Sequence, residues 1–178
     1  MSIFKQLIKS LHSPKYIAAF RMQGIGKTIN YLFFLALIMC IPMIVYMVLY
    51  AIGGNESARA VIETKLPILT MENDIITANS FILLPAMLIM YYLFVSFILF
   101  IKVSIFGGLG LWLAHLLKKR AEYRHTFRMT TYAVTLPTLL IAMTELMGLT
   151  LPFGYLFDWT ITSTILIMAI RYLPSAPK

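Results

Sequence analysis

At 178 residues, with 60% apolar and 12% charged residues and a mean hydropathy of +0.84, the chain is too apolar for a water-soluble fold, because a single core could not bury that much apolar surface. A net charge of +8 would suggest a nucleic-acid partner in a soluble protein, but here the distribution of the charge along the chain is more informative. We therefore expect an all-α polytopic membrane protein without a nucleic-acid partner. The single cysteine, Cys40, cannot form an intrachain disulfide.

Residues 1–28 are predicted to form a cytoplasmic amphipathic segment. Apolar residues recur at helical spacing in SIFKQLIKSL, and Lys5, Gln6, Lys9 and Ser10 lie opposite them. Such a helix suits the surface of an anionic lipid leaflet. A compatible alternative is that its apolar face packs on the chain's own cytoplasmic segment. Ser13 and Pro14 then form an N-cap and a first helical residue, which predicts a second short helix through Phe20.

The triplet Gly26-Lys27-Thr28 resembles the end of a phosphate-binding loop. The full pattern GxxxxGK[ST] needs a glycine at position 21, which is Arg21, and a membrane span follows where a soluble helix would be required. We therefore reject nucleotide binding. Instead, Gly24 and Gly26 are expected to let the chain turn from the interface into the bilayer.

A single membrane domain, residues 1–178, is expected to contain four transmembrane helices, each close to the ~20 residues needed to cross the hydrocarbon. These spans are residues 29–52, 80–101, 129–147 and 152–173. The last one crosses only if Asp158 is tolerated near one interface and Arg171 snorkels at the other. Residues 53–79 form an external loop, whose centre is compatible with either a short strand or a short helix.

The basic residues orient this arrangement. All but two of the 15 lysines and arginines fall in residues 1–28, in the basic cytoplasmic segment 102–128, or at the C-terminal end, as Arg171 and Lys178. By the positive-inside rule both termini face the cytoplasm of a multi-pass protein in a bacterial plasma membrane. We interpret residues 103–117 as a continuation of the second helix, because a fifth span would export the Lys118-Lys119-Arg120 cluster.

The basic segment contains a candidate docking or lipid-anchoring surface. Gly107, Gly108 and Gly110 lie in the cluster FGGLG and indicate either a hinge or a surface that another helix approaches closely. The remaining residues are aromatic or basic: Trp112, Lys118, Lys119, Arg120, Arg124 and Arg128. Such residues favour binding to anionic lipid, and the alternative is docking of a membrane-protein partner.

A candidate polar intramembrane site lies in the third and fourth spans. Thr131, Thr135 and Thr138 share one helical face, and Glu145 and Asp158 lie near the outer ends of the two spans. The favoured interpretation is that the threonines join helices and the acids are hydrated. The alternative is a cavity for a cation, a proton or a sugar hydroxyl. We find no spacing typical of a metal, cofactor or catalytic site and expect no enzyme.

Two stretches resemble a known family. IFKQLIKSLHSPKYIAAFRMQGIGKTINY is similar to the N-terminal signature of a family of uncharacterised membrane proteins from Gram-positive bacteria, some labelled maltodextrin utilisation proteins. FGGLG and YRHTFRMTTYAVTLPTLL resemble the glycine-rich helix end and third span of that family and, more remotely, of the Yip-type membrane proteins. The external loop is shorter than the insert associated with the family. The resemblance implies no catalytic residues.

We expect a non-enzymatic accessory or interaction subunit of a larger membrane assembly. The resemblance implies a link to carbohydrate (maltodextrin) uptake, with an ABC transporter as a candidate partner. The alternative is a small transporter or channel formed by a homo-oligomer, with the acidic and threonine residues lining its path. Four spans alone seldom enclose a pathway, so this alternative requires self-association.

Overall fold

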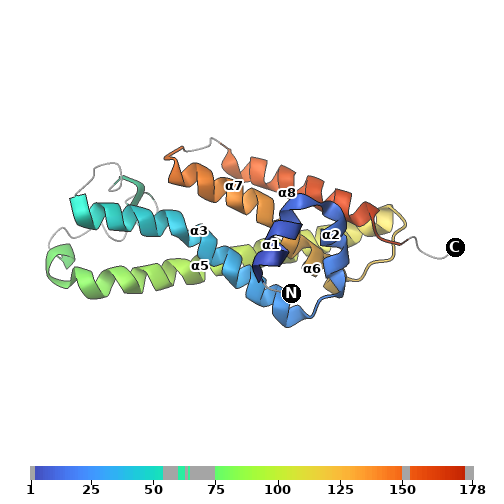
Figure 1. Cartoon of the computed structure of the whole chain (residues 1–178), viewed down its shortest axis with the longest axis horizontal. Coiled ribbons are helices and arrows are strands. Elements are labelled where there is room, and N and C mark those ends of the chain that lie inside the picture. Colours follow the sequence, from blue (N-terminus) through green and yellow to red (C-terminus); the bar gives the residue numbers. More distant parts are fainter. Residues whose placement is uncertain (1–2, 54–59, 63, 65–74, 150–152, 175–178) are drawn as a thin grey trace.

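The structure, a computed structural model, describes residues 3–53, 60–62, 64, 75–149 and 153–174, and the elements in these ranges are helices (Figure 1). In chain order they are α1 (Ile3–His12), α2 (Pro14–Ala19), the 3-10 helix η1 (Phe20–Met22), α3 (Ile25–Gly53), α5 (Ile75–Leu116), α6 (Tyr123–Ala133), α7 (Thr135–Leu146) and α8 (Gly154–Arg171). The predicted all-α class is confirmed. In the external loop, residues 60–62 and 64 are helical, and the rest of its predicted centre lies outside the described residues.

Two helices, rather than the expected four, are long and apolar enough to cross a membrane by length and composition, among the residues that the structure describes. The qualifying stretches are Ile25–Leu49 of α3 and Pro85–Leu116 of α5, which pack together as a hairpin (Figure 1). The sequence prediction therefore overcounted the helices that meet this test.

The expected third span is two short helices. The chain turns at Val134 between α6 and α7, which have 11 and 12 residues. Pro137 explains the break, because its ring has no N–H to donate to the carbonyl of Ala133 and crowds that turn. The expected fourth span is α8, which has 18 residues but includes Asp158 and a run of hydroxyl side chains that lower its apolar character.

The second predicted span and its predicted continuation form one helix, α5, of 42 residues. It passes through the glycine cluster without interruption, so the hinge interpretation is wrong. A Cβ atom on Gly107 would lie 3.3 Å from Phe127 Cα, and one on Gly110 would lie 3.1 Å from Leu166 Cδ2. The small side chains therefore let α6 and α8 approach α5 closely, whereas Gly108 has no such neighbour within 4 Å among the described residues.

The predicted amphipathic helix exists as α1, but two of its polar residues face the protein. Gln6 and Ser10 are buried, while the Phe4 and Ile8 side chains are 67% and 64% exposed. Lys5 and His12 are also exposed, on the neighbouring edge of the helix. The face towards the bundle is mixed, because Ile3 and Leu7 also pack against the core, and the outside of the helix has an apolar edge next to a cationic edge.

The predicted second helix is confirmed as α2. Ser13 is its N-cap, with the Lys15 backbone N–H donating to Ser13 Oγ over 3.3 Å. The Gly26-Lys27-Thr28 triplet lies in the first turn of α3, after an extended residue, Gln23, and 3-10 helix η1. This setting is unlike the strand-loop-helix of a phosphate-binding loop, in agreement with the sequence argument.

The main apolar core lies where α2, α6 and the C-terminal half of α8 meet the first turns of α3 and the end of α5. Its centre is an aromatic stack in which Tyr132 lies between Phe20 and Tyr31, with ring centroids 4.5 and 4.6 Å apart. Smaller clusters between α3 and α5 continue the packing along the hairpin.

Candidate functional site

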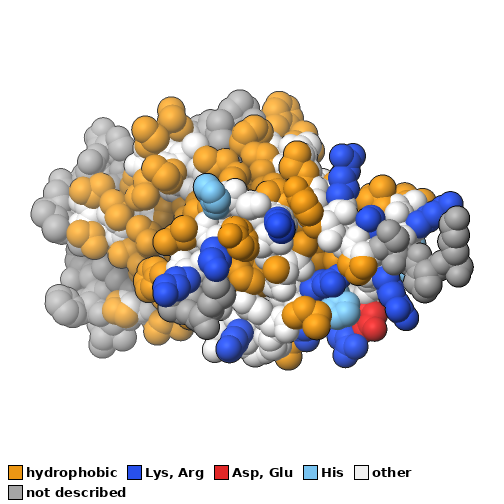
Figure 2. Space-filling view, turned by 45° about the vertical axis from the view of Figure 1, so that its right-hand side comes forward, with side chains coloured by type: hydrophobic (Ala, Val, Ile, Leu, Met, Phe, Trp, Pro, Cys, Tyr) orange, Lys and Arg blue, Asp and Glu red, His pale blue; other side chains and the backbone are white. Residues whose placement is uncertain are grey.

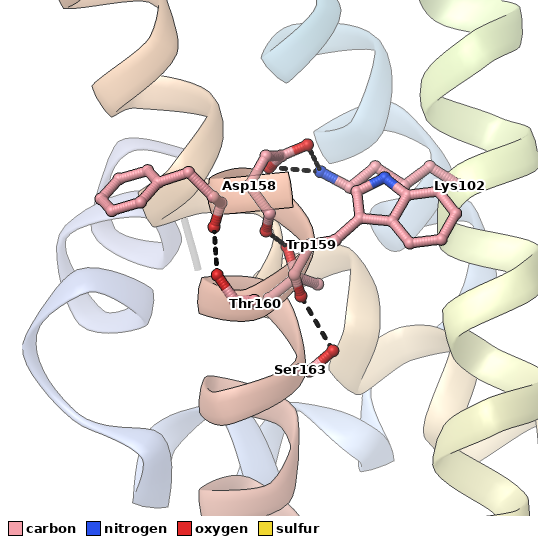
Figure 3. Close-up of polar contacts among 7 residues, drawn as sticks. Lys102, Asp158, Trp159, Thr160 and Ser163 are labelled. Carbon is pink, nitrogen blue, oxygen red and sulfur yellow. Dashed lines mark hydrogen bonds and ion pairs between the residues drawn. The ribbon is translucent and has the colours of Figure 1, made fainter. Parts of the chain in front are cut away.

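A buried ion pair joins α5 to α8. Lys102 Nζ donates to Asp158 Oδ1 at 2.6 Å and to Oδ2 at 2.5 Å (Figure 3). The two side chains are only 11% and 10% exposed. Because few waters can reach the pair, each charge depends on the other for its compensation.

Local structure around Asp158 fixes the position of its carboxylate. The chain enters α8 through Phe153, which has the left-handed φ of 62°, and Asp158 follows in the second turn. The Thr162 hydroxyl donates to the Asp158 carbonyl at 2.7 Å. The next residue, Trp159, packs edge-on against Phe106 of α5 with ring centroids 5.5 Å apart. This contact holds α8 against α5 beside the ion pair.

The sequence argument placed Lys102 at the cytoplasmic end of the second span and Asp158 near the outer end of the fourth. The ion pair contradicts that separation, because it brings the two residues to the same level of the bundle. A charge within a long apolar helix needs a partner of opposite sign. Lys102 is a charged residue within a 42-residue helix that otherwise has few charges. Its position was the signal that the sequence analysis missed.

The other predicted acid lies in a different environment. Glu145 is in the last turn of α7, and its backbone carbonyl accepts a hydrogen bond of 2.6 Å from the Tyr46 hydroxyl on α3. The Tyr46 bond ties the Glu145 backbone to α3, whereas the Asp158 side chain is paired with Lys102 on α5. Hydroxyl groups on α8 next to the pair bond to their own helix: Thr160 to the Phe157 carbonyl and Ser163 to the Trp159 carbonyl (Figure 3).

The three predicted threonines are all buried, and two have hydrogen bonds within the protein. Thr131 Oγ1 donates to the Phe127 carbonyl at 3.0 Å, and Thr135 Oγ1 lies 2.8 Å from the Tyr31 hydroxyl. Thr138 is buried on α7. Of the two hydrogen bonds, the one of Thr135 joins two helices, α7 and α3, whereas the one of Thr131 stays within α6.

Thr135 begins a chain of hydrogen bonds that ends on α1. Ser10 donates to the Leu7 carbonyl at 2.7 Å, so its oxygen can only accept from the Tyr31 hydroxyl, 3.3 Å away. The Tyr31 oxygen must then accept from Thr135. The order of donors is thus Thr135, Tyr31, Ser10, and it links α7, α3 and α1.

A second link holds α1 through Tyr132. Its hydroxyl oxygen lies 2.9 Å from Gln6 Oε1 and 2.8 Å from Gln23 Oε1. One hydroxyl proton can be donated to only one of these oxygens, so the other glutamine must present its amide NH₂ group. The polar face of α1 is therefore bound to α6 by a side chain at the centre of the core.

Replacing Tyr132 with phenylalanine should release α1 while leaving the aromatic stack in place. We expect a loss of about 1 to 2 kcal/mol in the free energy of unfolding. Backbone amides of α1 should exchange hydrogen faster, measured by mass spectrometry. Tyr172→Phe is the control, because the Tyr172 side chain is 60% exposed. Equal exchange in α1 of both variants would contradict the link.

The predicted docking or lipid-anchoring residues are mostly exposed. Trp112 is 62% exposed on α5, and Lys118, in the left-handed conformation with φ 53°, follows the end of that helix. Lys119 is partly buried and Arg120 exposed. Arg124 forms an exposed ion pair with Glu122, whereas Arg128 Nη1 donates to the Arg21 carbonyl at 2.8 Å.

Within the described ranges, no group of three His, Cys, Asp or Glu side chains is placed to hold a metal ion. The paired ammonium and carboxylate are engaged with each other, and the nearby hydroxyls bond to helix carbonyls. The ion pair therefore holds α8 on α5.

No curated protein and no solved structure matches the chain. A family model matches residues 4–81 and 74–170, which include nearly all of the helices described above. The expected membership of an uncharacterised family is confirmed; the Gram-positive origin, the maltodextrin label and the Yip-type likeness stay predictions. The chain belongs to the family described as "Protein of unknown function (DUF1189)".

Proposed function

We propose that the protein is a four-span integral membrane protein that acts as a non-enzymatic accessory or interaction subunit of a larger membrane assembly. The observation that carries this proposal is the apolar outer surface of the α3–α5 hairpin. In an apolar window of 18 residues, only 39% of the residues of α3 and 22% of those of α5 are buried within the chain. Helices this apolar and this exposed need lipid or partner helices around them.

The exposed residues of α5 include large side chains of a kind that packs well against other helices. Leu93, Phe94 and Phe97 are 59%, 61% and 63% exposed. In a bilayer, lipid tails are as apolar as these residues, so shape and close packing decide whether a partner helix replaces lipid there. This supports an interaction surface along α5.

The proposed topology has both termini in the cytoplasm, with α6–α7 and α8 completing the crossing. Two contacts support it, because they hold the basic segments together. The Arg120 backbone N–H donates to the Pro174 carbonyl at 3.1 Å, and Arg128 bonds to the Arg21 carbonyl. The N-terminal segment, the α5–α6 connection and the end of α8 therefore meet at one end of the bundle (Figure 1).

The polar side chains favour this function over a transport path. Asp158 is neutralised by Lys102, and Thr131 and Thr135 bond within the protein. Groups engaged in this way stabilise helix contacts and are not directed at a passing ion or sugar. From the resemblance, a carbohydrate-uptake ABC transporter is the first partner to test.

Co-purification tests the proposal directly. The tagged full chain is extracted into nanodiscs from its own membrane, and mass spectrometry determines which proteins accompany it and in what ratio. We expect a second membrane protein at a fixed ratio. A homo-oligomer alone would instead favour the transporter or channel, with Glu145 and Asp158 in its path.

A variant without the candidate transport charges separates the two functions further. Lys102→Met with Asp158→Leu removes the ion pair as a neutral unit, and Glu145→Gln removes the remaining candidate transport charge. An accessory subunit should keep its partner and the activity of the assembly. Loss of that activity with the assembly intact would refute the interaction role.

A further inference from the structure

At the basic end of the bundle, a cavity of about 240 Å³ lies among three segments far apart in the chain. Its wall is formed by η1, by the α5–α6 connection with the start of α6, and by Pro174 after α8. The residues that matter are Arg21, Met22, Arg120, Glu122, His125 and Pro174. Neither the ion pair nor the α1 links described above involve this cavity.

Backbone contacts hold the wall of the cavity in place. Arg120 N–H donates to the Pro174 carbonyl at 3.1 Å, and Arg128 Nη1 donates to the Arg21 carbonyl at 2.8 Å. In both cases the acceptor is a neutral carbonyl oxygen. Among the described residues, the guanidinium of Arg128 is placed beside the cavity wall without a carboxylate, and its Nε is a buried donor with no hydrogen-bond partner.

The charges around the cavity are unbalanced. Glu122 forms its ion pair with Arg124. Over the residues that the structure describes, neither Arg21 nor Arg120 has a carboxylate in an ion pair with it. Burial lowers the pKa of His125; Glu122 opposes this change, and Arg124, Arg21 and Arg128 lower the pKa further. The three arginines near His125 outnumber Glu122, and this excess of positive charge favours an anion.

The apolar part of the wall indicates which anion. Met22 is 75% exposed and lies at the start of the chain's path into α3, where Ile25 is 50% exposed. On the face in view, Figure 2 shows many basic side chains at this end and apolar side chains over much of the rest of the coloured surface. A ligand with a phosphate group and an acyl chain can satisfy both kinds of surface at once, and a free phosphate satisfies only the first.

We infer that this cavity binds the phosphate group of an anionic phospholipid, through Arg21 and Arg120, with its acyl chains running past Met22 towards α3. Arginine suits this role because its guanidinium donates two parallel hydrogen bonds to phosphate oxygens. The cavity is smaller than a drug-sized ligand site, which fits a headgroup whose chains remain outside. This inference is independent of the proposed accessory role.

Native mass spectrometry of the full chain in detergent tests the site, with phosphatidylglycerol and phosphatidylcholine of equal chain length as probes. The wild type should retain one phosphatidylglycerol in preference to phosphatidylcholine. Arg21→Gln with Arg120→Gln should weaken phosphatidylglycerol binding by at least about tenfold, since each lost charge-assisted hydrogen bond is worth about 1.5 kcal/mol or more. Arg21→Gln leaves the backbone carbonyl that binds Arg128 unchanged.

Lys15→Gln with Lys27→Gln is the matched control, because it removes the same charge from two exposed side chains outside the cavity. The control should bind phosphatidylglycerol as the wild type does. An equal loss of phosphatidylglycerol binding in both double variants would overturn the site, because it would mean that the lipid is attracted to basic residues in general. Displacement of the lipid by millimolar inorganic phosphate would overturn the lipid as the source of the anion. Unchanged thermal unfolding of both variants shows that binding, and not folding, was measured.

Discussion

Replacing Asp158 with asparagine is expected to lower the free energy of unfolding by about 3 kcal/mol or more. The substitution keeps the size of the side chain but leaves the Lys102 ammonium without a counter-charge in a position that is largely closed to solvent. Lys102→Met should cost a similar amount by leaving the carboxylate alone. The measurement is unfolding by sodium dodecyl sulfate in mixed micelles, followed by circular dichroism.

The combined variant Lys102→Met with Asp158→Leu should recover most of this loss, because apolar side chains of similar volume often replace a buried pair at little cost. Glu122→Gln supplies the second comparison. It breaks the pair with Arg124, in which the arginine and glutamate side chains are 64% and 60% exposed, and should change stability by less than about 1 kcal/mol. Additive effects in the combined variant would show that the two charges do not compensate each other.

Replacing Gly107 with leucine should prevent α6 from packing on α5. The new Cβ alone would lie 3.3 Å from Phe127 Cα, and a backbone atom cannot rotate away as a side chain can. We expect a loss of about 3 kcal/mol in the same unfolding measurement, at the upper end for overpacked sites. If the variant could not be extracted as a folded monomer, the loss of stability would be larger than this value.

Gly108→Leu provides the control at the next residue. A Cβ atom on Gly108 would have no neighbouring atom of the described residues within 4 Å, so leucine meets no obstacle there. Since glycine weakens a helix by about 1 kcal/mol, this variant should be as stable as the wild type or more stable. If both leucine variants behaved alike, the close approach of α6 at Gly107 would be refuted.

Local sequence signals predicted the fold best where they act within one or two turns. The pair Ser13 and Pro14 correctly predicted the start of α2. The helical spacing of the apolar residues in residues 2–11 correctly predicted α1. The apolar runs of α3 and α5 were also recognisable. Their predicted limits differed from the helices because the predictions marked the apolar runs, and the helices extend beyond these runs.

Contacts between distant elements could not be read in the same way. Lys102 was grouped with the basic segment because it follows an apolar run, yet its partner lies 56 positions later in the chain. The apolar face of α1 was predicted to contact lipid or the chain's own cytoplasmic segment, because the sequence does not show that Tyr31 and Tyr132 offer buried hydrogen-bond partners to the polar face. Pro137 explains why the predicted third span divides at Val134, but a proline in a sequence does not by itself show whether a helix bends or divides.

The unbroken course of α5 past its glycines has a mechanical consequence. From Ala86 to Leu116 it extends about 46 Å at about 1.5 Å per residue, and along the way it packs against α3, α6 and α8. A rigid rod of that length, tilted by about 10°, moves its far end sideways by about 8 Å. A partner that tilted the apolar hairpin would therefore displace the basic end of the protein.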